Sequence, residues 1–173
     1  MVRSNAALLR LPVMSSRLRS DMALKIRPRA VEAIAEVIRG GSGALETGGA
    51  LFGSDSAEVI EHATTPGPKA IHGPANFSRD REHTEAESSR LYRLDRSRWI
   101  GEWHTHPATE LIPSEVDLAT YVRHLTDPEL RFERFLALIC SASAPIQVAA
   151  WRIRIVSGRV TVDSPRLEVI HPS

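Results

Sequence analysis

The chain has 173 residues, of which 42% are apolar. This length is enough for one sizeable hydrophobic core and too short for two ordinary domains. The 22 basic and 21 acidic residues nearly cancel, which excludes nucleic acid or an anionic membrane as a partner selected by overall charge. No apolar run approaches the roughly 20 residues that span a bilayer, so we expect a single soluble domain.

The first 22 residues differ from the rest of the chain. Four arginines precede the first acidic residue, and Arg10 interrupts the short apolar run "AALLRLPVM". A secretory signal would need a longer uninterrupted apolar region and a small-residue cleavage site. We predict a disordered, arginine-rich tail over residues 1–22, with a transit peptide as the alternative, and a folded domain over 23–173.

The first third of this domain predicts a helix followed by a hairpin. Apolar residues recur at helical spacing behind Pro28, and Gly40-Gly41 stops the pattern. The spaced residues are Val31, Ile34, Ala35 and Ile38. Residues 44–53 and 57–65 are typical of two short strands around a turn. Residues 65–79 hold three prolines and two glycines, which predicts a loop with at most a brief strand near Asn76 and Phe77.

The rest of the chain alternates helix and strand patterns. Asp80 can cap a charged helix that runs to about Leu94, and Pro107 ends a strand over 97–105. Helical spacing returns at Leu118, Tyr121, Val122 and Leu125. Three further strands are expected over 134–142, 147–156 and 159–163, the last two joined by a tight turn at Ser157-Gly158. Helices mixed with largely sequence-adjacent strands favour a layered α+β domain.

The only cysteine, Cys140, lies in the apolar run "FLALICSA". An intramolecular disulfide is impossible, and a small buried hydrophobic residue is the expected role. A reducing cytoplasm fits this cysteine usage.

Two histidines flank one threonine in "GEWHTHP". Side chains two apart on a strand point to the same face, roughly 6.7 Å apart at the backbone, so His104 and His106 can converge on one ion. The loop after Pro107 lets the chain turn back and present Asp117 from the first turn of a helix. Two imidazoles and one carboxylate leave a fourth tetrahedral position for water, which is typical of a catalytic zinc site.

The same residues also fit a structure without metal. Ser114, with Asp117 three positions later, resembles a helix-capping arrangement, and an acid in the first turn suits the helix dipole. The two histidines also fit exposed positions of a strand. Their spacing alone therefore leaves both interpretations open.

Glu46 is a carboxylate in the otherwise apolar and glycine-rich segment "LETGGALFG". A zinc-bound water needs a base that takes its proton and passes it to the leaving amine. The alternative is a solvated glutamate at a strand edge, since a lone glutamate is usually exposed.

These residues share one order and spacing, E…H-x-H-x(7)-S-x-x-D, over residues 46 to 117. The matching residues are Glu46-Thr47, Gly49, Leu51, Gly53, His104-Thr105-His106-Pro107, Ser114 and Asp117. The pattern resembles the JAMM motif of the JAB/MPN/Mov34 metallopeptidases. The resemblance implies a single JAB/MPN domain of the α/β (α+β) class, a curved mixed β-sheet flanked by helices in a cytidine-deaminase-like arrangement.

The resemblance also implies the roles of five residues. One zinc ion per chain would be held by His104, His106 and Asp117. Glu46 would activate a water, and the Ser114 hydroxyl would stabilise the oxyanion, because a preorganised donor meets charge that develops only in the transition state. The presence of all five residues argues against the inactive scaffold members of the family.

One departure from the eukaryotic deubiquitinases of this type indicates a different branch. Those enzymes commonly carry an aromatic residue directly after the glycine that precedes the H-x-H pair, where this chain has Glu102 followed by Trp103. The sequence resembles the bacterial branch, which often accompanies ubiquitin-like conjugation systems in phage defence. Glu102 either orients an imidazole or is a solvated strand-edge acid. Trp103 is expected in the core or in the wall of a substrate pocket.

The remaining histidines and tryptophans form no comparable group. We expect the histidines at the surface or in loops, and the tryptophans in the core or a pocket wall, because no basic stripe accompanies them. The histidines are His62, His72, His83, His124 and His171, and the other tryptophans are Trp99 and Trp151.

We therefore expect a bacterial-type zinc metallopeptidase that cleaves after the C-terminal tail of a ubiquitin-like protein. Removal of the carrier from a lysine and maturation of its precursor both stay open. Expected partners are the carrier or its conjugates and the activating and conjugating enzymes of the same pathway, with neither nucleic acid nor membrane. The alternative is a non-catalytic zinc-containing binding module, against which Glu46 and Ser114 argue, because a scaffold needs neither a base nor an oxyanion donor.

Overall fold

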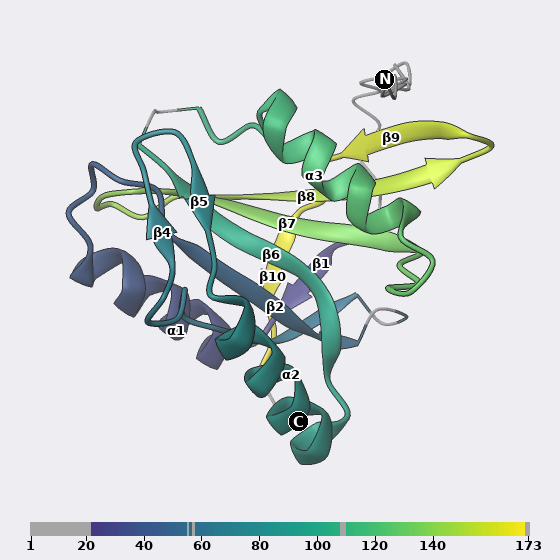
Figure 1. The fold of residues 1–173 in the computed structure, drawn as a ribbon, viewed down its shortest axis with the longest axis horizontal. Helices are drawn as coiled ribbons and strands as arrows, with labels where there is room; N and C mark the ends of the chain where they lie inside the picture. Colours follow the sequence, from purple (N-terminus) through teal and green to yellow (C-terminus); the bar gives the residue numbers. More distant parts are fainter. Residues whose placement is uncertain (1–21, 55, 57, 108–109, 172–173) are drawn as a thin grey trace, which may run out of the picture.

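The computed structural model describes residues 22–54, 56, 58–107 and 110–171, so nearly all of the predicted tail lies outside the described residues. Within the described residues, an eight-stranded sheet, a two-stranded hairpin and three helices are present (Figure 1). None of these helices is long and apolar enough to cross a membrane. In chain order the elements are β1 (Leu24–Ile26), α1 (Pro28–Gly40), β2 (Gly48–Ser54), β3 (Val59–Ala63), β4 (Ile71–His72), β5 (Phe77–Ser78), α2 (Arg81–Asp95), β6 (Arg98–His106), α3 (Glu115–Thr126), β7 (Arg134–Ser141), β8 (Val148–Val156), β9 (Arg159–Asp163) and β10 (Leu167–Val169).

The large sheet is mixed, with the strand order β10-β1-β3-β2-β6-β7-β8-β9. Strand β1 is parallel to β3 and β10, and β6 is parallel to β7, whereas the other neighbours are antiparallel. The sheet curves and has helices against it (Figure 1), which confirms the expected α+β class. Strand β6 is an interior strand between β2 and β7, so its main chain is fixed from both sides.

Helix α1 covers one face of the sheet. It begins at Pro28, where the missing amide costs nothing because first-turn amides have no intrahelical partner. Ala30, Ile34 and Ile38 are buried in the largest core cluster. Val31 is 38% exposed. On the first turn, the buried residue is therefore Ala30 and not the predicted Val31.

Helices α2 and α3 pack on the opposite face. Asp80 caps α2, as predicted, because its carboxylate accepts a first-turn amide at 3.1 Å. Helix α2 packs through Leu91 against Phe52, and α3 packs through Tyr121, whose ring stacks on Phe135 with centroids 4.9 Å apart. The two helices leave part of β6 uncovered between them, and this gap becomes the cleft described below.

A β-bulge in β6 decides which residues face this cleft. Two consecutive residues of β2 pair with Gly101 and Trp99, so Ile100 is the extra residue. A bulge reverses the alternation of side chains beyond it. Ile100 and Trp103 therefore pack in the cluster beneath α1, and Trp99 turns to the side of α2 and α3.

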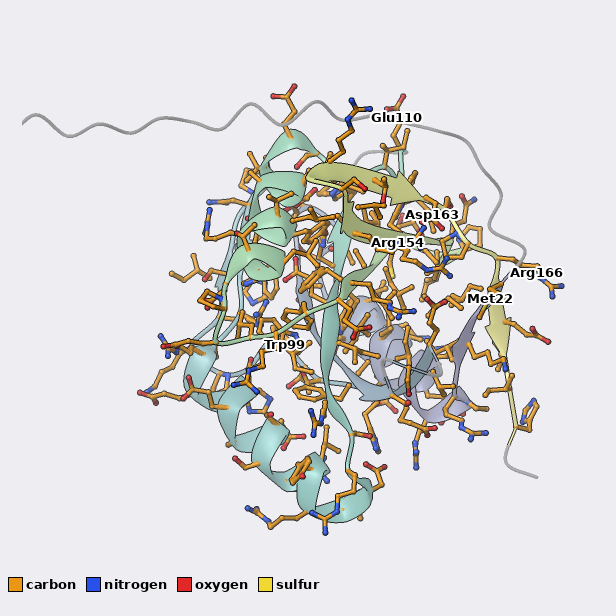
Figure 2. The ribbon with its side chains drawn as sticks, turned by 90° about the vertical axis from the view of Figure 1, so that its right-hand side faces the viewer. Met22, Trp99, Glu110, Arg154, Asp163 and Arg166 are labelled. Carbon is orange, nitrogen blue, oxygen red and sulfur yellow. The ribbon has the colours of Figure 1, made fainter. Side chains whose placement is uncertain are left out.

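An ionic network is buried where β8 and β9 approach the start of β1. Arg152 lies 2.5 Å from Glu58 and 3.0 Å from Asp163. Arg154 lies 3.3 Å from Asp163 (Figure 2), and the Met22 carbonyl accepts from Arg152 at 3.2 Å. Buried charges are tolerated when they are paired in this way. None of these residues lines the cleft, so we assign the network a structural role.

Candidate metal centre

His104 and His106 lie on the cleft side of β6, as strand alternation predicted. Their Nε2 atoms are 3.0 Å apart. The Nδ1 atom of His106 lies 3.2 Å from the main-chain oxygen of Glu110. Because a carbonyl oxygen only accepts, this Nδ1 carries a proton, and Nε2 of neutral His106 presents a lone pair. The two rings thus point nitrogen atoms at one place.

Asp117 joins them from the first turn of α3. Its Oδ1 lies 3.6 Å from Nε2 of His104, and its Oδ2 lies 3.5 Å from Nε2 of His106. Burial raises the pKa of Asp117, but hydrogen bonds from the two histidines and from Ser114 outweigh burial and lower that pKa below its usual range. The carboxylate is therefore ionised at neutral pH and can act as a ligand.

The separations of these donor atoms fit one small cation. Around a tetrahedral zinc with ligands at about 2.0–2.1 Å, neighbouring ligand atoms are about 3.3–3.4 Å apart. The separations here are 3.0, 3.5 and 3.6 Å, and one candidate ligand atom from each residue lies within 4.8 Å of the others. Imidazole suits zinc, copper, iron and nickel, so the donor set fits a transition metal, and zinc stays the predicted one.

Asp117 is also the capping residue that the sequence allowed, and its cap is compatible with a role as metal ligand. The amide and the hydroxyl of Ser114 each donate to Oδ2 of Asp117 at 2.7 Å, and the Asp117 amide donates to Oγ of Ser114 at 3.2 Å. This reciprocal capping box fixes the carboxylate at the start of α3. We call His104, His106 and Asp117 the metal group. The helix cap thereby orients one donor of this group.

Glu46 lies beside the group but not on a strand. Strand β2 begins two residues later, at Gly48, so the prediction of a strand through Glu46 was wrong. Gly48 pairs with His104, and the Thr47 carbonyl accepts from the main chain of β6 at 2.8 Å. This register brings Glu46 level with His106. Desolvation raises the pKa of Glu46, although attraction to the two histidines opposes the shift.

Two glycines at the start of β2, directly after Glu46 and Thr47, allow close contact with the neighbouring chain segments. A Cβ atom on Gly48 would collide with the Trp103 carbonyl oxygen and would lie 2.9 Å from both the Cβ of His104 and the ring of Phe77. A Cβ on Gly49 would collide with the Thr64 carbonyl oxygen and would lie 2.7 Å from the indole nitrogen of Trp103. Only glycine, which has no Cβ atom, fits a position that other parts of the chain approach so closely.

The metal group lies at one end of a cleft of about 890 Å³. Its floor is β6, and its sides are the β4–β5 hairpin, α2, α3 and the segment after α3. Glu110 lies beside the metal group, where its carbonyl contacts His106. Trp99 also lines the cleft, far from Glu110 and thus at the other end (Figure 2). His124, expected at the surface, is half-buried there with its ring 5.1 Å from Trp99. Burial lowers the pKa of His124 to about 4, so it is neutral at pH 7.

Glu102 lies on the cleft floor, in contact with neither histidine in the described hydrogen bonds. Nη1 of Arg79 donates to Oε2 of Glu102 at 2.7 Å, and the guanidinium lies 4.7 Å from the centroid of the Trp99 ring. The Glu102 side chain is only 14% exposed. It is therefore a paired acid of the cleft floor, which neither sequence alternative described. Trp99 takes the pocket-wall position, one of the two expected for it, whereas Arg79 is a cleft residue that no sequence pattern indicated.

Trp103 is not in the cleft wall. It is fully buried on the α1 side of the sheet, and its Nε1 donates to the Thr64 carbonyl at 3.0 Å. Of the two expected positions, the core is correct and the pocket wall is wrong. Trp99 takes the wall position because of the bulge, for which strand alternation gives no signal.

Comparison with known proteins identifies a family and relatives of this chain. A family model described as prokaryotic homologues of the JAB domain matches residues 29–154. A protein of Sinorhizobium fredii named "Probable metalloprotease y4qB" is 36% identical over 114 residues, which cover 62% of this chain and 70% of that protein. The Escherichia coli "CD-NTase/cGAS isopeptidase" is 28% identical over 88 residues, which cover 49% of this chain and 56% of that protein.

A solved structure has a similar fold. The solution structure of a protein from Desulfitobacterium hafniense superposes with a TM-score of 0.58 at 21% identity, covering 84% of this chain and 93% of that one. At this identity the likeness concerns the fold alone.

Proposed function

The chain belongs to the family of prokaryotic homologues of the JAB domain, and on that premise we propose that it is a zinc-dependent metallopeptidase of the JAMM type. It hydrolyses the peptide or isopeptide bond after the C-terminal tail of a ubiquitin-like protein. The observation that carries the proposal is the convergence of His104, His106 and Asp117 beside Glu46 at the end of a long cleft. Relatives named metalloprotease and isopeptidase support a hydrolase.

His104, His106 and Asp117 would hold the zinc ion. When bound there, zinc would polarise the scissile carbonyl and lower the pKa of water. The protein keeps these donors in place through their outer contacts. The Glu110 carbonyl fixes the tautomer of His106, and the Ser114 cap fixes the Asp117 carboxylate.

Glu46 carries the proton in this mechanism. Its carboxylate accepts a proton from the attacking water and returns it to the amine that leaves, so one group serves as base and then as acid. Partial desolvation raises its pKa and makes it a stronger base than an exposed carboxylate. Its place level with His106 puts it next to the reacting atoms.

The Ser114 hydroxyl serves as the oxyanion donor. It lies at the exposed start of α3 and lines the cleft beside Asp117. Rotation about its C–O bond turns the proton from Asp117 toward the oxyanion of the transition state. Because the Ser114 oxygen is already held at the cleft, only this proton has to turn before the hydroxyl stabilises the developing charge.

The cleft suits an extended peptide tail. Strand β5 pairs with β4 in the hairpin and lines the cleft, so an extended tail can add beside it as another strand. The ring of Phe77 packs against Gly48 next to His104 and narrows this end of the cleft, which favours glycine or alanine beside the cut. We place the reaction in a bacterial conjugation pathway of antiphage defence, with the named CD-NTase/cGAS isopeptidase as the supporting relative.

The test compares ubiquitin-like fusions and lysine conjugates that differ in the last residue of the carrier. We expect the zinc-loaded protein to cleave carriers that end in glycine or alanine, to lose cleavage when that residue is tryptophan, and to act little on unfolded casein. Glu46→Gln should keep zinc and fold while turnover falls by several orders of magnitude.

Three results of this test would contradict the proposal. Zinc-bound protein that cleaves no fusion would support the scaffold alternative. Near-normal turnover of Glu46→Gln would assign the base elsewhere, and rapid casein digestion without regard to the tail residue would indicate a general protease.

A further inference from the structure

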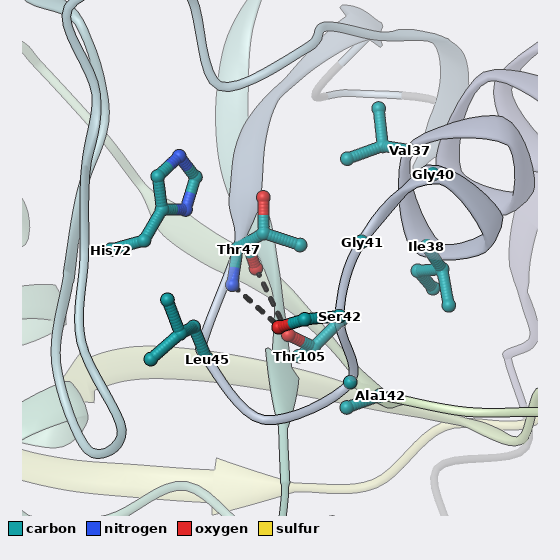
Figure 3. Close-up of a pocket in the computed structure, with 11 residues that line it drawn as sticks. Val37, Ile38, Gly40, Gly41, Ser42, Leu45, Thr47, His72, Thr105 and Ala142 are labelled. Atoms are coloured by element: carbon teal, nitrogen blue, oxygen red, sulfur yellow. Dashed lines mark hydrogen bonds between the residues drawn. The ribbon is translucent and has the colours of Figure 1, made fainter.

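The main chain around Glu46 is held from two sides by residues that the proposed chemistry does not use. On one side, the Thr47 amide donates to Oγ1 of Thr105 at 3.0 Å (Figure 3). The Thr105 amide donates to the Thr47 carbonyl at 2.8 Å. On the other side, the Glu46 amide donates to the Gly73 carbonyl at 2.8 Å. The Glu46 carbonyl lies 2.9 Å from Nδ1 of His72. Both main-chain groups of Glu46 are thus paired with the β4–β5 hairpin.

The segment that carries Glu46 has little packing on the side away from the cleft. Residues 41–47 join α1 to β2, and a cavity of about 290 Å³ lies between this segment, the end of α1 and His72 (Figure 3). Leu45, in the same segment, is 43% exposed. Because few side chains support the segment here, its position depends on the hydrogen bonds that hold it.

The hairpin holds His72 in turn. His72 is the cross-strand partner of Phe77, and the two ring centroids are 5.6 Å apart. The turn between the strands is closed by the Gly73 amide, which donates to the Asn76 carbonyl at 2.8 Å. Since the Glu46 carbonyl only accepts, Nδ1 of His72 carries the proton in their contact. The hairpin therefore presents a donor, on the exposed His72, to the residue that bears the base.

We propose that His72 is a positioning residue for Glu46, fixing the main chain of the base from the hairpin that also borders the substrate cleft. The inference rests on the proposed role of Glu46 as proton carrier. His72 itself does not line the 890 Å³ cleft, whereas its partner Phe77 does. A peptide that pairs with β5 therefore stabilises the same hairpin that holds the base.

Two substitutions of His72 separate the hydrogen bond from the presence of a side chain. His72→Leu removes the donor, and we expect kcat to fall about three- to tenfold, the effect of one modest hydrogen bond. KM should change less, because contacts in the cleft remain. His72→Asn places an amide donor near the position of Nδ1 and should recover most of the lost kcat. His83→Leu is the matched control, because His83 pairs with Thr65 and lines neither cavity.

Hydrogen–deuterium exchange of the metal-free protein gives a readout that needs no substrate. We expect faster exchange over residues 44–48 in His72→Leu, and wild-type exchange in His72→Asn and His83→Leu. Wild-type exchange and kcat in His72→Leu, or an Asn variant no better than the Leu variant, would overturn the inference. If the wild-type protein cleaves no fusion, the proposed function fails, and the exchange comparison alone decides whether His72 positions this segment.

Discussion

The two sides of strand β6 differ in what their side chains contact, although they share one backbone. On the cleft side, Glu102, His104 and His106 are polar and point toward the space between α2 and α3. On the other side, Trp103 and Thr105 are buried beneath α1 and the segment that carries Glu46. Residues of the candidate site and residues of the core therefore alternate along one strand, and substitutions on the two sides should have separable effects.

The largest effect on stability is expected from the buried side. Trp103→Ala removes a fully buried ring and should lower the free energy of unfolding by about 3–5 kcal/mol. Trp99→Ala, on the cleft side of the same strand, should lower it less because that ring is only half-buried. Chemical denaturation measures both. If Trp99→Ala proved the more destabilising, the assignment of the two sides would be reversed.

A loss of rate with little loss of stability is expected from the cleft side. Ser114→Ala should reduce kcat about 10²–10³-fold, as for a single oxyanion donor. This variant also loses a helix cap worth about 1 kcal/mol, so Ser114→Gly, which weakens the cap by only a few tenths, is the control. The kcat of Ser114→Ala and of Ser114→Gly should fall by the same factor, whereas Ser114→Thr should keep most of the wild-type kcat. Full activity in Ser114→Gly would exclude the hydroxyl from catalysis.

The smallest effect concerns pH and the Trp99 end of the cleft. Burial, and then repulsion from Arg79 and Arg123, lowers the pKa of His124 to about 4. Between about pH 6.5 and pH 4 the unfolded state therefore binds more protons than the folded state. The contribution of neutral His124 to the free energy of unfolding is complete above pH 6.5 and is lost as the pH falls toward 4. At pH 5 the loss should be on the order of 1 kcal/mol, since the ring is half-exposed.

His124→Phe keeps a ring that can pack against Trp99 and cannot be protonated. Its free energy of unfolding should therefore fall less than that of the wild type between pH 7.5 and pH 5. Equal losses in the two proteins, measured by urea denaturation at both pH values, would show that His124 is not the group responsible.

Features set by a few adjacent residues were predictable from the sequence. Pro28 starts α1, Asp80 caps α2, and Ser157 and Gly158 both adopt positive φ angles in the turn between β8 and β9. The Ser114–Asp117 cap was likewise visible as a local pattern. These features depend on interactions between residues only a few positions apart in the sequence. The side chains of those residues are therefore enough to specify them.

Features set by pairing between distant segments were not predictable. The three-residue strands β1 and β10 pair in parallel although most of the sequence lies between them. Each is too short to show a recognisable alternation of apolar and polar residues. Trp99 faces the cleft because of a bulge, and Glu46 reaches the metal group through the register of β2 on β6. The sequence therefore indicated residues that the structure brings together, whereas tertiary pairing determines how they are presented.

Metal content is the most direct test of whether His104, His106 and Asp117 form one binding site. Wild-type protein purified without chelator should contain about one zinc per chain by inductively coupled plasma mass spectrometry. His104→Ala and His106→Ala should each lose most of it while keeping the fold, and His83→Leu should keep it all. Wild-type protein that binds no zinc after remetallation, or histidine variants that retain a full equivalent, would contradict the site.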